Sequence, residues 1–336
     1  MTVPATQLES ENLPDPGATP EGDLAKVAGR SPTQLALARF RRDKLSMIAF
    51  VVVVLYILGG IAAPFLVKFG VLDPYTFHQE LTDPTLGGLP TGNFGGISWD
   101  HPLGVEPSTG RDVLSRMWYG ITFSLAIAIS ATIIAVALGT VLGIIAGFSG
   151  GWVDAIVGRI IDLTLSFPQT LMLLALSGPM VLALENAGVP QGDLANGLYV
   201  VLVLGIFGWP SIARIVRGQV LSIREREFVD AAKLLGASRR RLYFKEVLPN
   251  LWAPLLVQFT LVMPLYISAE AALNFLGVGI KPPTPTLGNL LNDAIVYATT
   301  DALFFFAPAF LIMIIVVSFN LLGDGIRDAL DPKSSR

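Results

Sequence analysis

Long runs without a charged side chain recur along this 336-residue chain, and they restrict its possible folds more than any other feature. A helix that crosses the hydrocarbon core of a bilayer needs about 20 predominantly apolar residues. Of all residues, 52% are hydrophobic and 15% are charged, whereas a soluble domain carries about 25% charged residues. The sequence therefore predicts an all-α polytopic membrane protein. It excludes a soluble enzyme, a disordered chain and a fibrous repeat.

Six windows are long and apolar enough to span a bilayer, so six transmembrane helices are expected. They lie at 45–67, at 117–153 with the helix itself at about 119–147, at 163–184 after a charged entry at 154–162, at 198–215, at 247–269 and at 302–323. The first window begins after 44 residues and is too long to be the apolar part of a secretory signal.

The distribution of Lys and Arg predicts the orientation of these spans, because basic residues concentrate in cytoplasmic loops. Four basic residues lie between 39 and 44, seven lie between 220 and 246, and three lie after 326. In contrast, the long segment 68–116 has three basic and six acidic residues. We therefore expect both termini to be cytoplasmic and segment 68–116 to be an external loop.

The spans divide the chain into five expected parts. The first two are a disordered cytoplasmic tail at 1–33 and an N-terminal segment with the first transmembrane helix at 34–67. The external loop 68–116 follows, with a short helix near 112–118. The last two are a core transmembrane domain of five helices at 117–323, which includes a cytoplasmic loop at 220–249, and a cytoplasmic C-terminal tail at 324–336.

The chain lacks the motifs of several chemistries. It has no cysteine, no phosphate-binding G-x-x-x-x-G-K-[ST] motif and no H-E-x-x-H motif, so we expect no ATP hydrolysis, no metal site and no directly bound cofactor. Its two histidines, His78 and His101, both lie in the expected external loop, which disfavours a proton relay through the membrane. The net charge of −3 gives no basis for binding nucleic acid.

Charged residues in or near the spans are candidates for intramembrane or partner contacts. Arg159 and Asp162 are three residues apart, so they share a helix face and are expected to form a structural pair. Glu270 lies deeper and has no charged neighbour in sequence. A cavity, a partner subunit and the outer interface are all open as its surroundings.

A stripe of small residues follows one face of the second span. Its members are four residues apart: Ala131, Ala135, Gly139, Gly143 and Gly147. Such a stripe allows two helix backbones to approach closely in lipid, so it predicts helix packing and not a pore lining.

The loop 224–248 is amphipathic, and its sequence predicts two short helices around a turn. Phe228, Ala232 and Leu235 are spaced to form one apolar face. Gly236 suits the left-handed residue that ends a helix, and Ser238 suits the cap of the next one. That second helix carries an apolar stripe, at Leu242, Val247 and Leu248, and Pro249 marks the return to the membrane. These residues alone fit either a docking site for another protein or a basic helix that rests on anionic lipid.

A run of this loop resembles a known motif. Asp230-Ala231-Ala232 is followed by Gly236 after three residues, and Leu248-Pro249 begins twelve residues later. This pattern resembles the EAA loop of the membrane subunits of bacterial ABC importers, with Asp230 in place of the usual Glu. Four further stretches are similar to dipeptide/oligopeptide permeases of the DppC/OppC type, at 37–47, at 101–104 with 110–116, at 270–277 with 282–285, and at 319–328. Glu106 stands where this family usually has Asp, and the resemblance covers about 35–332.

The resemblance implies a type I ABC importer permease fold in a bacterial cytoplasmic membrane. It also implies partners: a DppB/OppB-type permease, two cytoplasmic ATPases that are DppD/OppD-like and DppF/OppF-like or fused into one, and an extracytoplasmic substrate-binding protein. The partner ATPases would bind ATP and Mg, and this chain would form half of the pathway for a short peptide. Same-architecture relatives that import nickel chelates, glutathione or oligosaccharides are an alternative, and a stand-alone secondary carrier or channel is another.

Two sets of contact residues follow from the resemblance. The ATPase-coupling loop is expected to act through Glu227, Asp230, Ala231, Ala232, Gly236, Leu248 and Pro249. In the external loop, Gly110, Arg111 and Asp112 are expected to face the binding protein or the partner permease.

Overall fold

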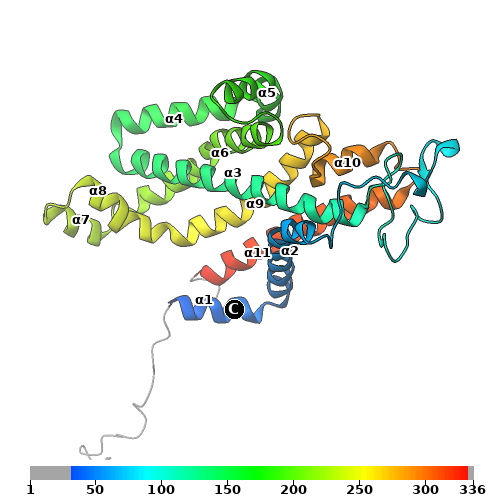
Figure 1. Cartoon of the computed structure of the whole chain (residues 1–336). Helices are drawn as coiled ribbons and strands as arrows, with labels where there is room; N and C mark the ends of the chain where they lie inside the picture. Colours follow the sequence, from blue (N-terminus) through cyan, green and yellow to red (C-terminus); the bar gives the residue numbers. More distant parts are fainter. Residues whose placement is uncertain (1–31, 332–336) are drawn as a thin grey trace, which may run out of the picture.

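The computed structural model of this protein describes residues 32–331 (Figure 1). The expected disordered tail at 1–33 therefore lies almost entirely outside the described residues, as does the end of the chain after Asp331. The regular secondary structure of residues 32–331 is helical, apart from one antiparallel pair of two-residue strands, β1 (Thr82–Asp83) and β2 (Leu89–Pro90), and an isolated bridge between Val105 and Asp112.

Eleven α-helices follow one another along the described chain. They are α1 (Pro32–Arg42), α2 (Lys44–Lys68), α3 (Val113–Ser149), α4 (Gly151–Ser166), α5 (Gln169–Asn186), α6 (Asp193–Ile223), α7 (Glu227–Leu234), α8 (Arg239–Arg241), α9 (Trp252–Phe275), α10 (Leu287–Ile295) and α11 (Ala302–Leu330). A π-helical turn at Leu242–Val247 and a 3-10 turn at Leu248–Leu251 join α8 to α9. Two further 3-10 turns flank β1, at Gln79–Leu81 and Pro84–Leu86.

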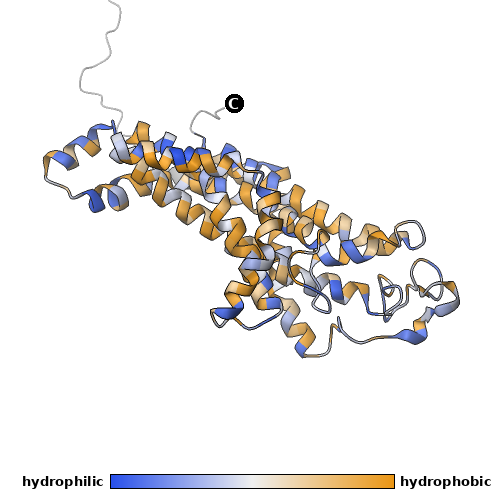
Figure 2. Ribbon diagram, turned by 90° about the horizontal axis from the view of Figure 1, so that it is seen from above, coloured by the Kyte–Doolittle hydropathy of each residue, from blue (hydrophilic) through white to orange (hydrophobic). Residues whose placement is uncertain are grey.

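Five helical segments of the described chain are long and apolar enough to cross a membrane. They are α2, α3, α6, the continuous segment Arg239–Phe275 and α11. Figure 2 shows these long helices to be mainly hydrophobic, with hydrophilic residues toward the two ends of the bundle and in its loops. The number of spans becomes six if α4 and α5 together count as one.

The third expected span is not a straight helix. α4 and α5 are inclined by 87° to each other at a break between Ser166 and Gln169. Pro168 has no N–H to continue a helix, and it restricts Phe167 before it to extended backbone, with φ −87° and ψ 137°. The break could not be predicted from the uncharged run 163–184, because hydropathy gives no information about a change in the direction of a helix.

Other boundaries differ from expectation at helix ends. The short helix expected near 112–118 is the first turn of α3, because Asp112 caps that helix directly. α6 extends beyond 198–215 in both directions. α11 continues to Leu330, so most of the described part of segment 324–336 is helical.

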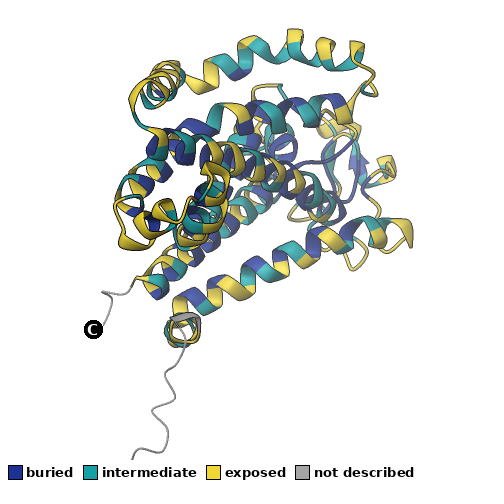
Figure 3. Ribbon diagram, turned by 90° about the vertical axis from the view of Figure 1, so that its left-hand side faces the viewer, coloured by how far each residue is buried: buried dark blue, intermediate teal, exposed yellow. Residues whose placement is uncertain are grey.

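The α3–α6 pair forms the centre of the fold. A Cβ added to Gly143 of α3 would lie 2.8 Å from the Ala213 carbonyl oxygen and from Val216 Cβ of α6. Gly139 and Gly147 meet α6 in the same way, one turn before and one turn after. Ala131 and Ala135 are fully buried. The small-residue stripe is therefore a packing surface, as predicted, and Figure 3 shows the buried residues concentrated in the middle of the bundle.

The two ends of the bundle differ in what they carry. At one end, here called the loop end, Arg224 Nη1 donates to the Gly147 carbonyl, so α6 and α3 end together beside α7 and α8 (Figure 1). The Arg39 guanidinium donates to the Asp331 carbonyl (2.9 Å), which joins α1 to the end of α11. Segment 69–112 and α10 lie at the opposite end.

Candidate functional site

The loop 224–248 is attached to the bundle by an apolar inner face. Val229 of α7 and Val247 of the π-helical turn are fully buried, and Leu242 is 4% exposed. Ala232 packs against the same core from α7. The expected stripe of Leu242, Val247 and Leu248 is confirmed. In contrast, Ala232 points inward with Val229 and does not share an outer face with Phe228 and Leu235.

The turn inside this loop has the predicted geometry. Gly236 adopts φ +77°, its N–H donates to the Lys233 carbonyl, and the Ala237 N–H donates to the Ala232 carbonyl. These two bonds form the Schellman motif that ends a helix at a left-handed residue. Ser238 then caps the next helix by accepting from the Arg241 N–H (3.4 Å). A Cβ added at position 236 would meet no atom within 4 Å, so it is the backbone conformation that favours glycine here.

An apolar surface remains uncovered on the outside of the loop. We call the three residues that form it the apolar tip: Phe228, Leu234 and Leu235, which are 40%, 89% and 88% exposed. Large side chains this exposed mark a contact surface when they lie side by side. The expected coupling residues Glu227, Asp230 and Ala231 are also exposed around this tip.

The remaining coupling residues lie nearer the bundle. Leu248 is half-buried and Pro249 is exposed, both in the 3-10 turn that leads into α9. The Asp230 carboxylate accepts from Lys233 Nζ at 2.9 Å, within its own helix. The first part of the predicted motif, Glu227 to Ala231, therefore surrounds the apolar tip, whereas its last part, Leu248-Pro249, lies where the loop joins α9.

A second group of residues, not predicted from the sequence, connects the loop to the end of α3. Ser149 and Tyr243 share a hydrogen bond of 3.0 Å between their hydroxyls, and the Phe148 and Tyr243 rings meet edge to face at 5.2 Å. Lys233 Nζ lies 5.7 Å from the centre of the Phe148 ring, a cation–π distance. No local pattern reports these contacts, because they join residues more than 80 positions apart.

The expected Arg159–Asp162 pair does not form. The Asp162 carboxylate accepts instead from Arg214 of α6 (2.7 Å), and Asp154 of α4 accepts twice from Arg217. α4 lies beside α6, so its carboxylates reach arginines across the helix interface. Together these residues line a cleft of about 420 Å³.

Glu270 is fully buried where α3, α9 and α10 meet. Its carboxylate accepts from the Ser124 hydroxyl (2.9 Å) and from the Asn274 amide, and Asn274 also donates to Thr286 Oγ1 (3.1 Å). The Leu287 N–H at the start of α10 donates to Ser124 Oγ (3.3 Å). Within the chain, Glu270 therefore joins three helices through hydrogen bonds and faces no open cavity.

Gly110, Arg111 and Asp112 are directed into segment 69–112 itself. Arg111 is 6% exposed, and its Nε donates to Glu106 Oε2 at 2.6 Å. Asp112, also 6% exposed, accepts from the Ser115 N–H and contacts His101. The Arg111 and Asp112 side chains thus already have partners inside the chain, which does not match the expectation that they face another protein. A contact made by the rest of this segment is still a prediction.

Gly110 itself is held by close backbone packing. It adopts φ +70°, and a Cβ there would lie 2.1 Å from the His78 carbonyl oxygen. Arg116, fully buried, adds a second guanidinium 3.6 Å from Glu106. This buried ion cluster of Glu106, Arg111 and Arg116 fixes the start of α3 at the end opposite the loop.

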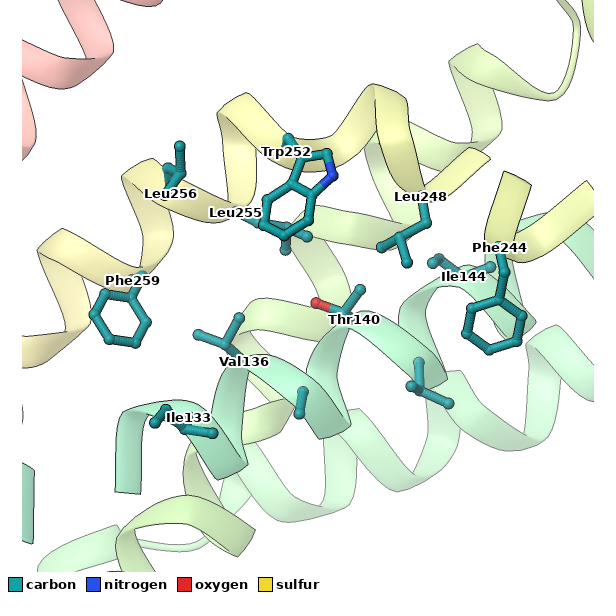
Figure 4. A pocket seen from close by; sticks show the side chains of 12 residues that line it. Ile133, Val136, Thr140, Ile144, Phe244, Leu248, Trp252, Leu255, Leu256 and Phe259 are labelled. Carbon is teal, nitrogen blue, oxygen red and sulfur yellow. The ribbon is translucent and has the colours of Figure 1, made fainter. Parts of the chain in front are cut away.

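An apolar groove of about 530 Å³ lies between α3 and the segment that begins α9 (Figure 4). Figure 4 shows aliphatic and aromatic side chains facing it from both helices, with the Thr140 hydroxyl among them. No titratable side chain lines this groove. Within residues 32–331, no group of three or more His, Asp and Glu is arranged to hold a metal ion.

Comparison with known proteins places this arrangement in a family. Residues 139–336 match the model of the binding-protein-dependent transport system inner membrane component. Residues 31–84 match the N-terminal TM domain of oligopeptide transport permease C. An inward-facing structure of the MetNI methionine ABC transporter shares the fold, with a TM-score of 0.52, 21% identity, and coverage of 65% of this chain and 96% of that chain.

Three curated relatives cover almost the whole chain. The dipeptide transport system permease protein DppC of Alkalihalophilus pseudofirmus is 33% identical over 95% of both chains. The oligopeptide transport system permease protein OppC of Bacillus subtilis is 34% identical over 96% of this chain and 97% of its own length. The glutathione transport system permease protein GsiD of Shigella flexneri is 37% identical over 90% of this chain and 91% of its own length.

Family membership follows from both the model matches and these identities. The family consists of non-catalytic, multi-pass membrane subunits of ABC importers, which work with a second permease, with separate ATPases and with a binding protein. The fold agrees, since its apolar helices are arranged as in a type I importer permease. The chain belongs to the DppC/OppC-type permease family of binding-protein-dependent ABC importers.

Proposed function

We propose that this chain forms half of the translocation pathway of a bacterial peptide importer and that its loop 224–248 docks on a cytoplasmic ATPase. The apolar tip carries this proposal, because Phe228, Leu234 and Leu235 are exposed at the end of a loop whose inner face is buried and hydrogen-bonded. A rigid, anchored element with an apolar outer surface can transmit the movement of a partner to the helices that carry it.

We propose a separate task for each partner. A homologous DppB/OppB-type permease completes the pathway, and two ATPases, DppD/OppD-like and DppF/OppF-like or fused, supply the energy. An extracytoplasmic binding protein delivers the peptide.

We further propose a bacterial inner (plasma) membrane location with six spans, in which α4 and α5 together make the third. Both termini and the loop end are then cytoplasmic. The positive-inside rule supports this orientation. The seven basic residues of 220–246 lie at the loop end, whereas most of the charged residues of segment 69–112 are acidic. The chain has no cysteine, so single-cysteine variants at Leu235 and Asn93 can test it. An impermeant thiol reagent added to whole cells should label this chain at 93 and not at 235, and the reverse result would refute the orientation.

The proposed cargo is a short peptide. The relatives are named for dipeptides, oligopeptides and glutathione, and glutathione is itself a small peptide. ATP-dependent uptake of a labelled di- or tripeptide by the reconstituted complex, with its binding protein, tests the assignment. If the complex took up a nickel chelate or an oligosaccharide but no peptide, the proposed cargo would be wrong and that solute would be the cargo. Substrate movement by this chain alone, without ATP, would make it a secondary carrier and refute the proposal.

The coupling role is tested at Gly236. Gly236→Val forces a β-branched side chain into the left-handed region, at a cost of roughly 1–2 kcal/mol or more. We expect the variant to insert in the membrane but to lose most of its co-purifying ATPase. Gly236→Asn is the matched control, because Asn tolerates this conformation and should retain the complex. Ala232→Arg, which places a charge in the buried inner face, should also release the ATPase. Normal assembly and uptake in both Gly236→Val and Ala232→Arg would refute the coupling role.

A further inference from the structure

The cleft between α4 and α6 gathers five charged side chains on two mainly apolar helices. Two ion pairs cross it, with Nη2 of Arg214 2.7 Å from Asp162 and Nη2 of Arg217 2.7 Å from Asp154. Arg159 of α4 also lines the cleft. The volume of about 420 Å³ is large enough for several water molecules or a small solute.

These charges lie well inside the helices. Asp162 is eleven residues from the start of α4, or roughly 16 Å at 1.5 Å per residue. Arg214 is nine residues before the end of α6, or roughly 13 Å. Figure 1 shows α4 running beside α3 and α6 from the loop end inward. Asp162 directly precedes the expected span 163–184, and Arg214 lies one residue before the end of the expected span 198–215, so the pair lies toward the loop end of the membrane.

The same side chains are exposed in the isolated chain. The Asp162 and Arg214 side chains are 62% and 57% exposed, although they are paired with each other. Charged groups on membrane-spanning helices almost always face the interior of an assembly or a water-filled cavity. The open side of the cleft therefore faces water or a second subunit.

The charges of the cleft do not balance. Three guanidinium groups line it and only two carboxylates, both of which are already paired. Arg159 is the remaining cation, since no carboxylate among residues 32–331 lies within ion-pair distance of it. An unpaired guanidinium beside water is a binding group for a carboxylate.

We infer that the α4–α6 cleft lines the water-filled path for the cargo and that Arg159 contacts the free carboxylate of a peptide as it passes. This inference rests on the proposed function and adds residues to its pathway. Two neighbouring ion pairs keep the cleft hydrated while leaving a single net positive charge. One exposed guanidinium gives a weak contact, which suits a path that a solute must leave again.

A cysteine placed in the cleft tests both parts. Ala155→Cys lies among the lining residues, and Ile160→Cys lies on the opposite face of α4 as its control. Inverted membrane vesicles that hold the assembled transporter without nucleotide are treated with anionic or cationic methanethiosulfonates of similar size. Mass spectrometry of this chain follows the reaction, and denatured samples give the maximum.

We expect the thiol of Ala155→Cys to react and the thiol of Ile160→Cys to stay protected. The ratio of the anionic to the cationic rate should fall by about threefold on adding Arg159→Gln, which corresponds to one lost charge at close range in a hydrated site. Arg159→Lys should restore most of the ratio, which a merely structural role would not predict. Millimolar dialanine should slow the reaction of the anionic reagent with Ala155→Cys more than dialanine amide does.

Protection of Ala155→Cys from both reagents would overturn the inference, because the cleft would then be covered by another subunit. The carboxylate contact would be overturned if the ratio of the anionic to the cationic labelling rate did not change in Arg159→Gln. It would also be overturned if dialanine and its amide slowed the labelling equally. The peptide importer itself is judged separately: if the wild-type complex shows no ATP-dependent peptide uptake, the proposed function fails whatever the labelling rates.

Discussion

Asp43 shows how one side chain can start a membrane helix. α1 ends at Arg42 and α2 begins at Lys44, and the Asp43 carboxylate between them accepts from the N–H groups of Leu45 (3.1 Å) and Ser46 (3.3 Å). The hydrogen bond from the Ser46 hydroxyl, together with these N–H donors, lowers the pKa of Asp43. The carboxylate thus satisfies N–H groups that have no partner within the helix.

Replacing this cap should loosen the first turn of α2. We expect Asp43→Ala to cost about 1 kcal/mol locally and to speed hydrogen exchange at residues 45 and 46. Because the folded pKa is lower than the unfolded value, the ionised cap stabilises at neutral pH, and this contribution is lost as the pH falls through the folded pKa. Asp43→Asn should retain most of the protection but without this acid dependence. Unchanged exchange in Asp43→Ala would show that the cap does not hold the turn.

Glu106 compensates two buried guanidinium groups at once. The side chains of Arg111 and Arg116 are 7% and 0% exposed, and both approach the same Oε2 atom. Glu106→Gln keeps the shape of the side chain but leaves the two cations without their carboxylate. Breaking a buried ion pair in this way costs about 3–5 kcal/mol. We expect the purified variant complex to melt at a clearly lower temperature, whereas Glu80→Gln, at an exposed carboxylate of the same segment, should melt like the wild type.

At this scale the sequence predicted local chemistry well and distant chemistry poorly. Gly236 and Ser238 were predicted correctly, because a helix end and a helix cap depend on neighbouring residues. The partner of Asp162 was predicted wrongly, since Arg214 is 52 positions away. The surroundings of Glu270 stayed open for the same reason, because Ser124 is 146 positions away.

Between elements, the approach of α3 to α6 is set by backbone contact. Gly143→Ala would place Cβ 2.8 Å from the Ala213 carbonyl oxygen, which cannot move without shifting α6. We expect this variant to lose thermal stability in detergent, by roughly 1–3 kcal/mol, as overpacked cores do. Gly218→Ala is the matched control on α6, since a Cβ there meets nothing within 4 Å. It should be neutral or slightly stabilising, and equal effects of the two changes would contradict the packing argument.

The positions of most helices could be predicted from hydropathy, but their shapes could not. α2 matches its expected window within one residue at each end, because charged residues bound it on both sides. The third window did not predict the break between α4 and α5, since Pro168 and not a charge divides it. The inner face of the loop was missed at Val229, although Val229 and Ala232 have the three-residue spacing of a helix face.

For the molecule as a whole, α4 and α5 bury the fewest residues of the helices longer than 15 residues. Each buries a single residue within the described chain, Ile161 in one and Leu173 in the other. Figure 3 shows both at the edge of the bundle with most residues exposed or half-exposed. Two bent helices with so little support are expected to gain contacts from the second permease that the family requires.

Hydrogen exchange can measure that gain. We expect amides of 151–186 to exchange faster than those of α3 when this chain is purified alone, and to become protected in the assembled transporter. Amides at the centre of α3 serve as the internal control, because they should be protected in both samples. Equal protection of 151–186 with and without the partners would show that these helices are stable without a second permease.

α3 has one more property that the other long helices lack. It has 37 residues and is therefore about 55 Å long, nearly twice the hydrocarbon thickness. α2, α5, α6, α9 and α11 each contain an internal proline, and α3 contains none. One of its termini is fastened by Arg116 to Glu106 and the other by Ser149 to Tyr243. Because α3 has no proline kink between these two attachments, we expect a tilt imposed at one terminus to move the other terminus as well. A displacement at the loop end would therefore be transmitted along α3 to the opposite end of the bundle.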